Sequence, residues 1–377
     1  MQNILERLEL GLTGGDRQTA TRGLGIHNLL FMATELLALG KGGDAELPIV
    51  LIEEPEAHLE PQRQLRLVEY LLERAKTHAT SGAEQLQIIL TSHSPNLASR
   101  IPLKHVTLIH GGRAFSLAPQ KTMLEHSDYE FLERFLDVTK ANLLFARGIL
   151  IVEGDAEALL LPTLAEILGR PLGKAGVSIV NVGHKGLFRY ARILQRASGD
   201  GDIPIPVSCI ADRDIPPAMA RLLDLTQQKT EDVFSADDLK KHNDTLSAVA
   251  GGPVKVFVSP TWTFEFDLAQ SGLGELVHIA ACLAKTRASK PFIAKTIRGA
   301  REEFKGWQSE SKDQIGLACK VYSPFLGKAG TKPSKAETAQ WLARLLRRKW
   351  LQERVRKGKL LPEYLVAAID HATQEGK

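Results

Sequence analysis

Acidic side chains follow three apolar segments of this sequence, at points where strands are expected to end. Glu153 comes directly after the apolar run GILIV, and Glu157 follows about one helical turn later, so both carboxylates can face one cavity. Asp212 and Asp214 close the segment VSCIADRD with a spacing that places both side chains on one face of a strand. Glu265 lies in a third segment, SPTWTFEFDL.

The third segment shows a two-residue alternation of polar and aromatic residues, which is typical of a half-buried strand. We expect its aromatic side to pack against the core and to aim Glu265 the other way. The polar side comprises Thr261, Thr263, Glu265 and Asp267, and the aromatic side comprises Trp262, Phe264 and Phe266.

Carboxylates crowded in this way would repel one another, and burying unpaired charge is costly. Divalent cations that prefer oxygen ligands remove that repulsion, and magnesium commonly binds a few carboxylates together with water and phosphate. Two such ions can activate a water and stabilise the leaving oxygen of a phosphodiester. A single acid at a strand end is more often a helix cap or a surface charge, but three strand ends in chain order favour a metal site.

The segments that must position these acids alternate between apolar strands and amphipathic helices, which favours an α/β fold with doubly wound parallel sheets. Strands are predicted at 49–52, at QIILTS, and at 148–152, 177–182, 205–214 and 254–260. The segment VTLIHGGRAFSLAP predicts a hairpin with a glycine turn, which marks a boundary. The predicted domains are 1–140, 146–345 with a helical insertion at about 215–250, and a basic helical tail at 346–377.

Glu53 and Glu54 end the first of these strands, in IVLIEEPEAHL, and His93 follows the next strand in TSHSP. Ligands bind at the carboxyl ends of strands in α/β folds. The two motifs resemble the Walker B segment and the switch-histidine loop of ABC-type ATPases. The resemblance implies that Glu53 serves a magnesium ion, that Glu54 orients the attacking water and that His93 senses the γ-phosphate. Gly23 and Gly25, in TRGLGIHNLL, are a looser match to the signature helix.

No segment matches the phosphate-binding GxxxxGK[ST] pattern, because FLGKAGTK follows no predicted strand and has the wrong spacing. We therefore expect that this chain begins inside an ATPase domain and does not bind ATP tightly alone. ATP would be a cofactor of a longer protein only.

The order of Glu153, then the pair Asp212 and Asp214, resembles the Toprim fold of topoisomerases, primases and certain nucleases. An ABC-type ATPase followed directly by Toprim, with ExxxE at the first acids, resembles the OLD (overcoming lysogenization defect) nucleases over roughly residues 20–345. The resemblance implies DNA nicking and cleavage with two Mg²⁺ or Mn²⁺ ions. It assigns one ion to Glu153, Asp212 and Asp214, and the other to Glu157 and Glu265 assisted by Ser259 or Thr263.

The resemblance also implies a late lysine that stabilises charge on the phosphate in the transition state. The match in SKAETAQWLA is Lys335, although Lys328 and Lys332 lie close by. In VNVGHKG, His184 and Lys185 are candidate contacts to a DNA phosphate, and a turn with exposed charge is the alternative.

The net charge of +4 is divided unevenly along the chain. Residues 285–377 carry 21 Lys/Arg and 9 Asp/Glu, a net of +12, which leaves a net of −8 for the rest. A basic region suits the binding of a polyanion such as DNA, although a solvated helical face is the alternative. Cys209, Cys282 and Cys319 lie far apart without a CxxC pair, so neither a disulfide framework nor a zinc knuckle is indicated.

No apolar run approaches the length of a membrane span, and the first residues lack the features of a signal peptide. We therefore expect a cytoplasmic protein without a membrane partner. Two other functions remain open: a Toprim topoisomerase or primase, and a non-catalytic DNA-binding or assembly module. Self-association through the ATPase or Toprim region is also possible, because ABC-type domains commonly pair around nucleotide.

Overall fold

The structure of the protein is a computed structural model. It describes residues 24–39, 49–80, 86–183, 186–197, 201–226, 228–286, 290–311, 313–327 and 332–374. The chain forms two compact units. The first comprises Met1–Pro102 and Leu136–Ala141, and the second comprises Leu103–Phe135 and Asn142–Lys377. None of the helices in the described ranges has both the length and the apolar character that crossing a bilayer requires.

The first unit is built on two parallel strands, β1 (Ile49–Glu53) and β2 (Gln87–Thr91), with helix α3 (Pro61–Thr80) between them in the chain. Its other helices are α2 (Leu24–Leu39), α4 (Pro95–Ala98) and α6 (Val138–Ala141). The strand–helix–strand order of this region is as predicted. Its small core consists of Leu59, Leu67 and Leu71, with partly buried apolar residues of α2, α3 and both strands packed against it.

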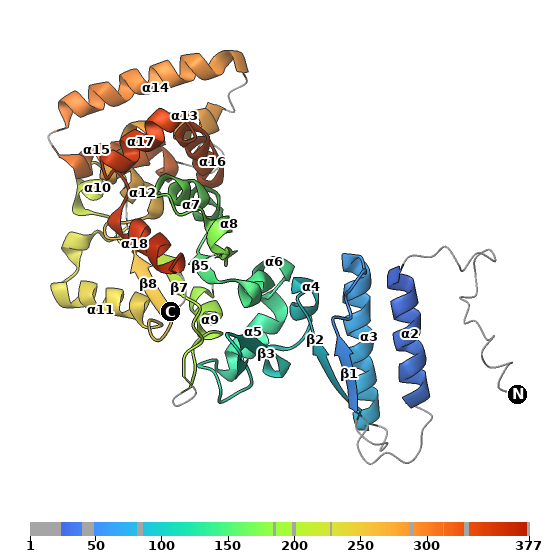
Figure 1. Ribbon diagram of the computed structural model, residues 1–377. Helices are drawn as coiled ribbons and strands as arrows, with labels where there is room; N and C mark the ends of the chain where they lie inside the picture. The colour runs from blue at the N-terminus through green and yellow to red at the C-terminus, as the bar shows by residue number, and fades with distance from the viewer. Residues whose placement is uncertain are drawn as a thin grey trace, which may run out of the picture. The chain divides into compact units, whose positions relative to one another are not determined.

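The second unit contains a four-stranded sheet in the order β6-β5-β7-β8, in which every neighbouring pair is parallel (Figure 1). The strands are β5 (Gly148–Val152), β6 (Val177–Asn181), β7 (Val207–Ala211) and β8 (Val254–Val258). Every residue of β5 and β7 is buried, as expected for central strands of a sheet covered on both faces. The predicted α/β class with a parallel sheet is confirmed.

The predicted hairpin before this sheet is also present. β3 (Thr107–His110) pairs antiparallel with β4 (Arg113–Ser116) across Gly111 and Gly112, which both have positive φ. Short helices follow it: α5 (His126–Phe135) and the 3-10 segment η3 (Asn142–Phe145), with η2 (Leu103–His105) before it.

Helices connect the strands of the sheet and then form a separate group after it. The connecting elements are α7 (Asp155–Ile167), α8 (Leu172–Ala175), α9 (Leu187–Arg192), α10 (Ala218–Leu222), η4 (Glu231–Val233) and α11 (Ala236–Ser247). After β8 follow α12 (Phe264–Leu268), the π-helical turn η5 (Ala269–Leu273), α13 (Gly274–Thr286), α14 (Lys290–Glu310), α15 (Gln314–Tyr322), η6 (Ser323–Leu326), α16 (Lys335–Leu346), α17 (Lys349–Lys357) and α18 (Glu363–Ala372). Figure 1 shows α14 lying across the outside of α13, α15, α16 and α17.

The last helix, α18, is an integral part of the sheet's core. Ser208 in β7 donates a hydrogen bond through its hydroxyl to the carbonyl of Ala368, at 2.8 Å. A side chain at Gly148 in β5 would meet the carbonyl of Ala372 at 2.0 Å, so only glycine allows this approach. The basic residues of the predicted C-terminal tail therefore lie on helices whose apolar faces belong to the main core.

Candidate active site

The first acids of the site lie where β5 ends and α7 begins. Glu153 follows the strand directly and is partly buried, whereas Glu157 in the first turn of the helix is 7 % exposed. Gly154 lies between them, and a Cβ there would be 3.2 Å from a carboxylate oxygen of Glu157. The glycine thus lets the Glu157 carboxylate fold back over the start of the helix, toward the end of the strand.

The second pair of acids follows β7. Asp212 accepts a hydrogen bond from the backbone amide of Phe264 at 2.8 Å, which fixes its carboxylate beside the start of α12. The amides of Arg213 and Asp214 both donate to the carbonyl of Trp262, each at 3.1 Å. Asp214 has a φ of 58°, a left-handed conformation that Asp tolerates better than most residues, and it is exposed.

The segment that carries Glu265 differs from the alternating strand that was predicted. β8 ends at Val258, and residues from Phe264 onward form the short helix α12, whose first amides are capped by the hydroxyl of Thr263. Trp262, Phe264 and Phe266 are buried, as predicted. The alternation nevertheless fails for the acids, because Glu265 and Asp267 are also buried, which an outward strand face would not allow.

Glu265 lies opposite Lys335, the first residue of α16, with 2.7 Å between the Lys335 ammonium and a Glu265 carboxylate oxygen. The Glu265 side chain is 7 % exposed and that of Lys335 is 45 % exposed. Thr263 also donates a hydrogen bond to Glu265 at 3.3 Å. Of the other lysines considered, Lys332 is exposed and Lys328 lies outside the described residues.

The electrostatics of these residues show that they share one environment. Burial is the largest cause that raises the pKa of Asp212, which reaches about 9. The negative charges of Glu265, Glu157 and Glu153 raise this pKa further, whereas the positive charge of Lys335 lowers it. Burial, then Asp214 and Glu157, raises the pKa of Glu153 to about 7. Burial lowers the pKa of Lys335, but the negative charges of Glu265 and Asp212 outweigh it and raise that pKa.

Burial is also the largest cause that raises the pKa of Glu157, and the charge of Glu265 adds to it. Acids from the ends of β5 and β7 and from α12 therefore meet at one edge of the sheet. We call Glu153, Glu157, Asp212, Asp214 and Glu265 the acid cluster. Its oxygen-only donors and its excess of negative charge suit a hard divalent cation such as Mg²⁺ or Mn²⁺.

Two residues beside the acid cluster were not among the predicted metal ligands. Asp267 is 3 % exposed and accepts a hydrogen bond from the Ser259 hydroxyl at 2.6 Å, while its other carboxylate oxygen is buried without a partner. Burial raises its pKa to about 6. The hydroxyl of Tyr364, on α18, is likewise buried without a partner, and its pKa is raised by burial and by Asp267 and Asp212. Tyr364 follows Asp267 by 97 residues, Asp212 by 152 and Glu153 by 211, so no local pattern could reveal it.

Such orphaned buried polar atoms are uncommon, and an ion or ordered water that partners them is the usual explanation.

Ser259 was predicted to help hold an ion together with Glu157 and Glu265. Its hydroxyl is directed to Asp267 in this structure, so it can act on the acid cluster by orienting that neighbour. His184 and Lys185 lie outside the described residues.

The ATPase-like residues of the first unit form a more open arrangement. Glu54, with a φ of 42°, faces His93 at 3.4 Å, and their side chains are 51 % and 83 % exposed. Glu53 ends β1 and is also exposed. Glu56, which the sequence did not single out, accepts hydrogen bonds from the Ser92 hydroxyl at 2.7 Å and from the His93 amide at 2.8 Å, and so ties the two loops together.

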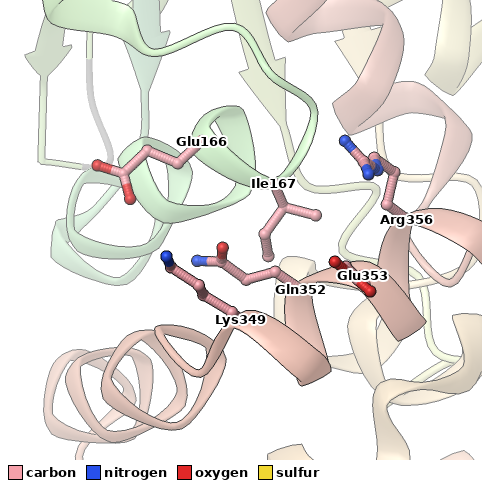
Figure 2. Close-up of a pocket in the computed structure, with 6 residues that line it drawn as sticks. All are labelled: Glu166, Ile167, Lys349, Gln352, Glu353 and Arg356. Carbon is pink, nitrogen blue, oxygen red and sulfur yellow. The ribbon is translucent and has the colours of Figure 1, made fainter.

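A polar pocket of about 250 Å³ lies between α7 and α17, where side chains of the two helices face each other (Figure 2). It is lined by Glu166, Ile167, Lys349, Gln352, Glu353 and Arg356. None of these residues belongs to the acid cluster, and the mixture of opposite charges offers no excess charge to a substrate.

Comparison with known families finds two matches along the chain. Residues 144–214 match the family model described as "Overcoming lysogenization defect protein-like, TOPRIM domain". This segment includes the acids that follow β5 and β7. Over this segment the chain is similar to the OLD family. Residues 3–98 match the AAA ATPase domain family, and this segment includes β1, β2 and His93.

Two curated relatives are similar to this chain over about 250 residues. The OLD nuclease of Thermus scotoductus is 25 % identical over 249 residues, which are 64 % of this chain and 45 % of the relative. Endonuclease GajA of Bacillus cereus is 22 % identical over 251 residues, which are 60 % of this chain and 36 % of the relative. The chain thus spans less than half the length of these relatives.

Among solved structures, the C-terminal region of the Xanthomonas campestris pv. campestris OLD protein matches with 22 % identity and a TM-score of 0.35, over 62 % of this chain and 94 % of that one. The similarity to the OLD family rests on the family models and not on this superposition.

Proposed function

We propose that this chain carries the nuclease centre of an OLD-type protein, and that it nicks and cleaves DNA with two Mg²⁺ or Mn²⁺ ions. The observation that carries the proposal is the convergence of Glu153, Glu157, Asp212 and Glu265 into one buried environment beside Lys335. Burial, and then the charges of the neighbouring acids, raises the pKa of Glu153, Glu157 and Asp212, and a bound cation would offset that repulsion. The relatives named as nucleases support the same class of reaction.

The residues divide into two ligand sets in this proposal. Glu153, Asp212 and Asp214 would hold one ion, and Glu157 and Glu265 the other, with Thr263 and Ser259 in support. The ions would supply an activated water and charge stabilisation for the leaving oxygen. The protein's own part is to hold the carboxylates in place through the Phe264 amide and the Thr263 hydroxyl.

Lys335 would stabilise the negative charge that develops on the phosphate. Its ammonium already lies at the edge of the acid cluster, and its side chain is half exposed, so a phosphate can approach it from solvent. It also begins α16, whose N-cap Ser334 accepts a hydrogen bond from Glu337, so its backbone is fixed. Its position beside the acid cluster and its place at the start of α16 distinguish Lys335 from Lys332.

For the rest of the chain, we propose that residues 1–140 are the C-terminal part of an ATPase domain, that 146–345 form the Toprim nuclease domain with its insertion at 215–250, and that the basic helices of 346–377 contribute to DNA binding. ATP would act only in the full-length protein, so added ATP should change cleavage by this chain very little. We also propose that the protein self-associates through the ATPase or the Toprim region and that it is cytoplasmic.

Supercoiled plasmid provides the test of this function. Incubation with Mn²⁺ or Mg²⁺ should give nicked and then linear DNA, and EDTA should prevent both. Binding of DNA should weaken steeply as salt rises, because basic residues that neutralise phosphates release counterions. Plasmid that stays intact with both metals across salt concentrations, while DNA is still bound, would instead support a non-catalytic binding module. Relaxation without strand breaks would support a topoisomerase.

A further inference from the structure

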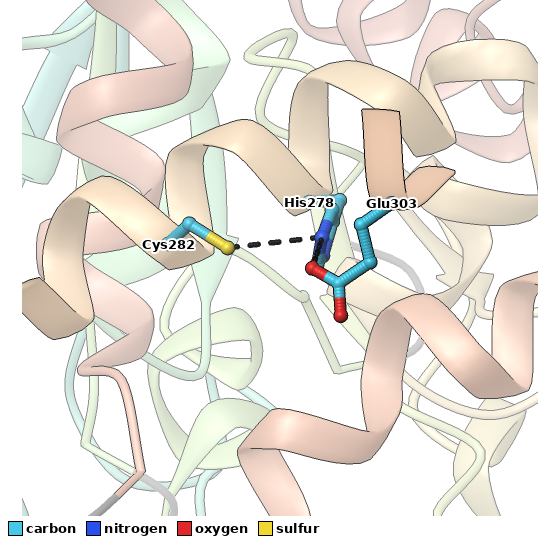
Figure 3. A group of neighbouring side chains, drawn as sticks. All are labelled: His278, Cys282 and Glu303. Carbon is cyan, nitrogen blue, oxygen red and sulfur yellow. Dashed lines mark hydrogen bonds and ion pairs between the residues drawn. The ribbon is translucent and has the colours of Figure 1, made fainter. Parts of the chain in front are cut away.

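A second group of metal-binding side chains lies in the helical part of the second unit. His278 and Cys282 are four residues apart on α13, so they lie on the same face of the helix, and Glu303 reaches them from α14 (Figure 3). The Nε2 atom of His278 is 2.8 Å from a carboxylate oxygen of Glu303 and 3.7 Å from the sulfur of Cys282. All three ligand atoms lie within 4.8 Å of one another.

The surroundings hold His278 in place. His278 is 2 % exposed, and its ring lies 4.5 Å from that of Trp307, between their centroids. On the same two helices, Ile279, Leu283 and Ala300 form a small apolar cluster. The other ring nitrogen of His278, Nδ1, is buried without a hydrogen-bond partner. The imidazole is thus fixed by packing, with Nε2 directed at the cysteine and the glutamate.

The distance between the His278 nitrogen and the Cys282 sulfur is compatible with a tetrahedral ion. With Zn–N and Zn–S bonds of about 2.05 and 2.3 Å, the nitrogen and sulfur of a tetrahedral site are about 3.5 Å apart. The observed separation of 3.7 Å is close to this value. The glutamate oxygen is nearer than a tetrahedral site requires, but the Glu303 side chain is 52 % exposed and can withdraw.

The donor types separate this group from the acid cluster. A thiol, an imidazole and one carboxylate favour a borderline-soft cation such as Zn²⁺, whereas the all-oxygen acid cluster favours Mg²⁺ or Mn²⁺. The two groups share no residue. Three protein ligands would leave the fourth position of a zinc ion to water, on the side where Glu303 is open to solvent.

We propose that His278, Cys282 and Glu303 bind a zinc-type divalent cation that joins α14 to α13. On binding, the Cys282 thiol gives up its proton and its sulfur bonds to the ion, with no change of oxidation state. The role of the site is to stabilise this pair of helices, because a ligand that binds only the folded state raises its stability.

Cobalt provides the test, because a thiolate bound to Co²⁺ absorbs in the near ultraviolet and oxygen ligands do not. The whole protein, reduced and freed of metal, is titrated with Co²⁺ in excess Mg²⁺, so that the acid cluster is occupied. We expect one equivalent to give the thiolate absorption, Zn²⁺ to displace it, and the nearby Trp307 fluorescence to fall.

Variants separate this site from other cobalt binding. Cys282→Ser should remove the thiolate absorption, and Glu303→Gln should weaken Co²⁺ binding at least about tenfold. Glu302→Gln is the matched control, because Glu302 is the exposed neighbour of Glu303 on the same helix and should leave binding unchanged. Zn²⁺ should raise the melting temperature of the unsubstituted protein and of Glu302→Gln, but not that of Cys282→Ser. Absence of the absorption from the unsubstituted protein, or its persistence in Cys282→Ser, would overturn the proposal.

Discussion

The acid cluster and the ATPase-like residues both lie at the carboxyl ends of parallel strands, yet they differ in how deeply they are buried. In the acid cluster, Glu157 and Glu265 are buried, and their charges help to raise the pKa of neighbouring acids. At the ends of β1 and β2, the side chains of Glu54 and His93 are half exposed or more. Chemical groups at strand ends therefore form a strongly coupled site only where further elements cover them, here α12, α16 and α18.

The largest expected difference between the two regions lies in catalysis. Asp212→Asn should lower the rate of plasmid nicking by about 1,000-fold or more, because a metal ligand contributes several kcal/mol of transition-state stabilisation. The rate should be measured at saturating Mn²⁺. Asp244→Asn, at an exposed position on α11, is the matched control and should cleave normally. Equal nicking by the Asp212 variant and the unsubstituted protein would remove the acid cluster from catalysis.

A smaller effect is expected from the lysine at the edge of the cluster. Lys335→Gln should lower single-turnover cleavage on the order of 100-fold, because one charge donor to the phosphate is lost. Binding of Mn²⁺ should become tighter, since a positive charge beside Glu265 is removed. Lys332→Gln serves as the control with an exposed lysine. If the control lost activity and Lys335→Gln did not, the assignment would pass to Lys332.

The burial of the acids also predicts how stability depends on pH. The folded pKa of Asp212 is about 9, against an ordinary value of 3.8, so the folded protein holds more protons than the unfolded chain between these values. The stability of the metal-free protein should therefore fall as pH rises from about 4 to about 9. Melting curves with and without Mn²⁺ measure this.

Bound Mn²⁺ should flatten the pH dependence of stability, because the ion replaces the protons. In the absence of metal, Asp212→Asn should reduce this pH dependence. A metal-free melting temperature that rises across pH 5 to 8 would contradict the strong burial of these acids.

The smallest effect is expected at the ends of β1 and β2. His93→Ala should change the free energy of unfolding by less than about 1 kcal/mol, because exposed ion pairs contribute about that much or less. Urea denaturation measures the change, and Glu56→Gln is the informative comparison, since Glu56 accepts two hydrogen bonds that join the loops. A loss of several kcal/mol in His93→Ala would show that this region is as tightly coupled as the acid cluster.

Local sequence patterns predicted the sheet well, because buried parallel strands are short apolar runs that need no distant information. The run 148–152 is β5 itself, and 177–182 and 254–260 differ from β6 and β8 only at their carboxyl ends. The pattern failed after Pro260, where polar and aromatic residues alternate as in a strand. Thr263 caps a helix there instead, and the contacts that favour the helix come from Tyr322 and other distant residues of the core.

The sequence by itself determined that acids end successive strands and that a sheet must gather them, since parallel strands bring their carboxyl ends to one edge. Only the tertiary structure decided which further groups meet them. Lys335 reaches Glu265 from 70 residues away, and Tyr364 is buried beside Asp267 from a helix near the end of the chain. The same holds for Glu303 beside His278, because contacts between distant helices depend on how their apolar faces pack and not on any local spacing.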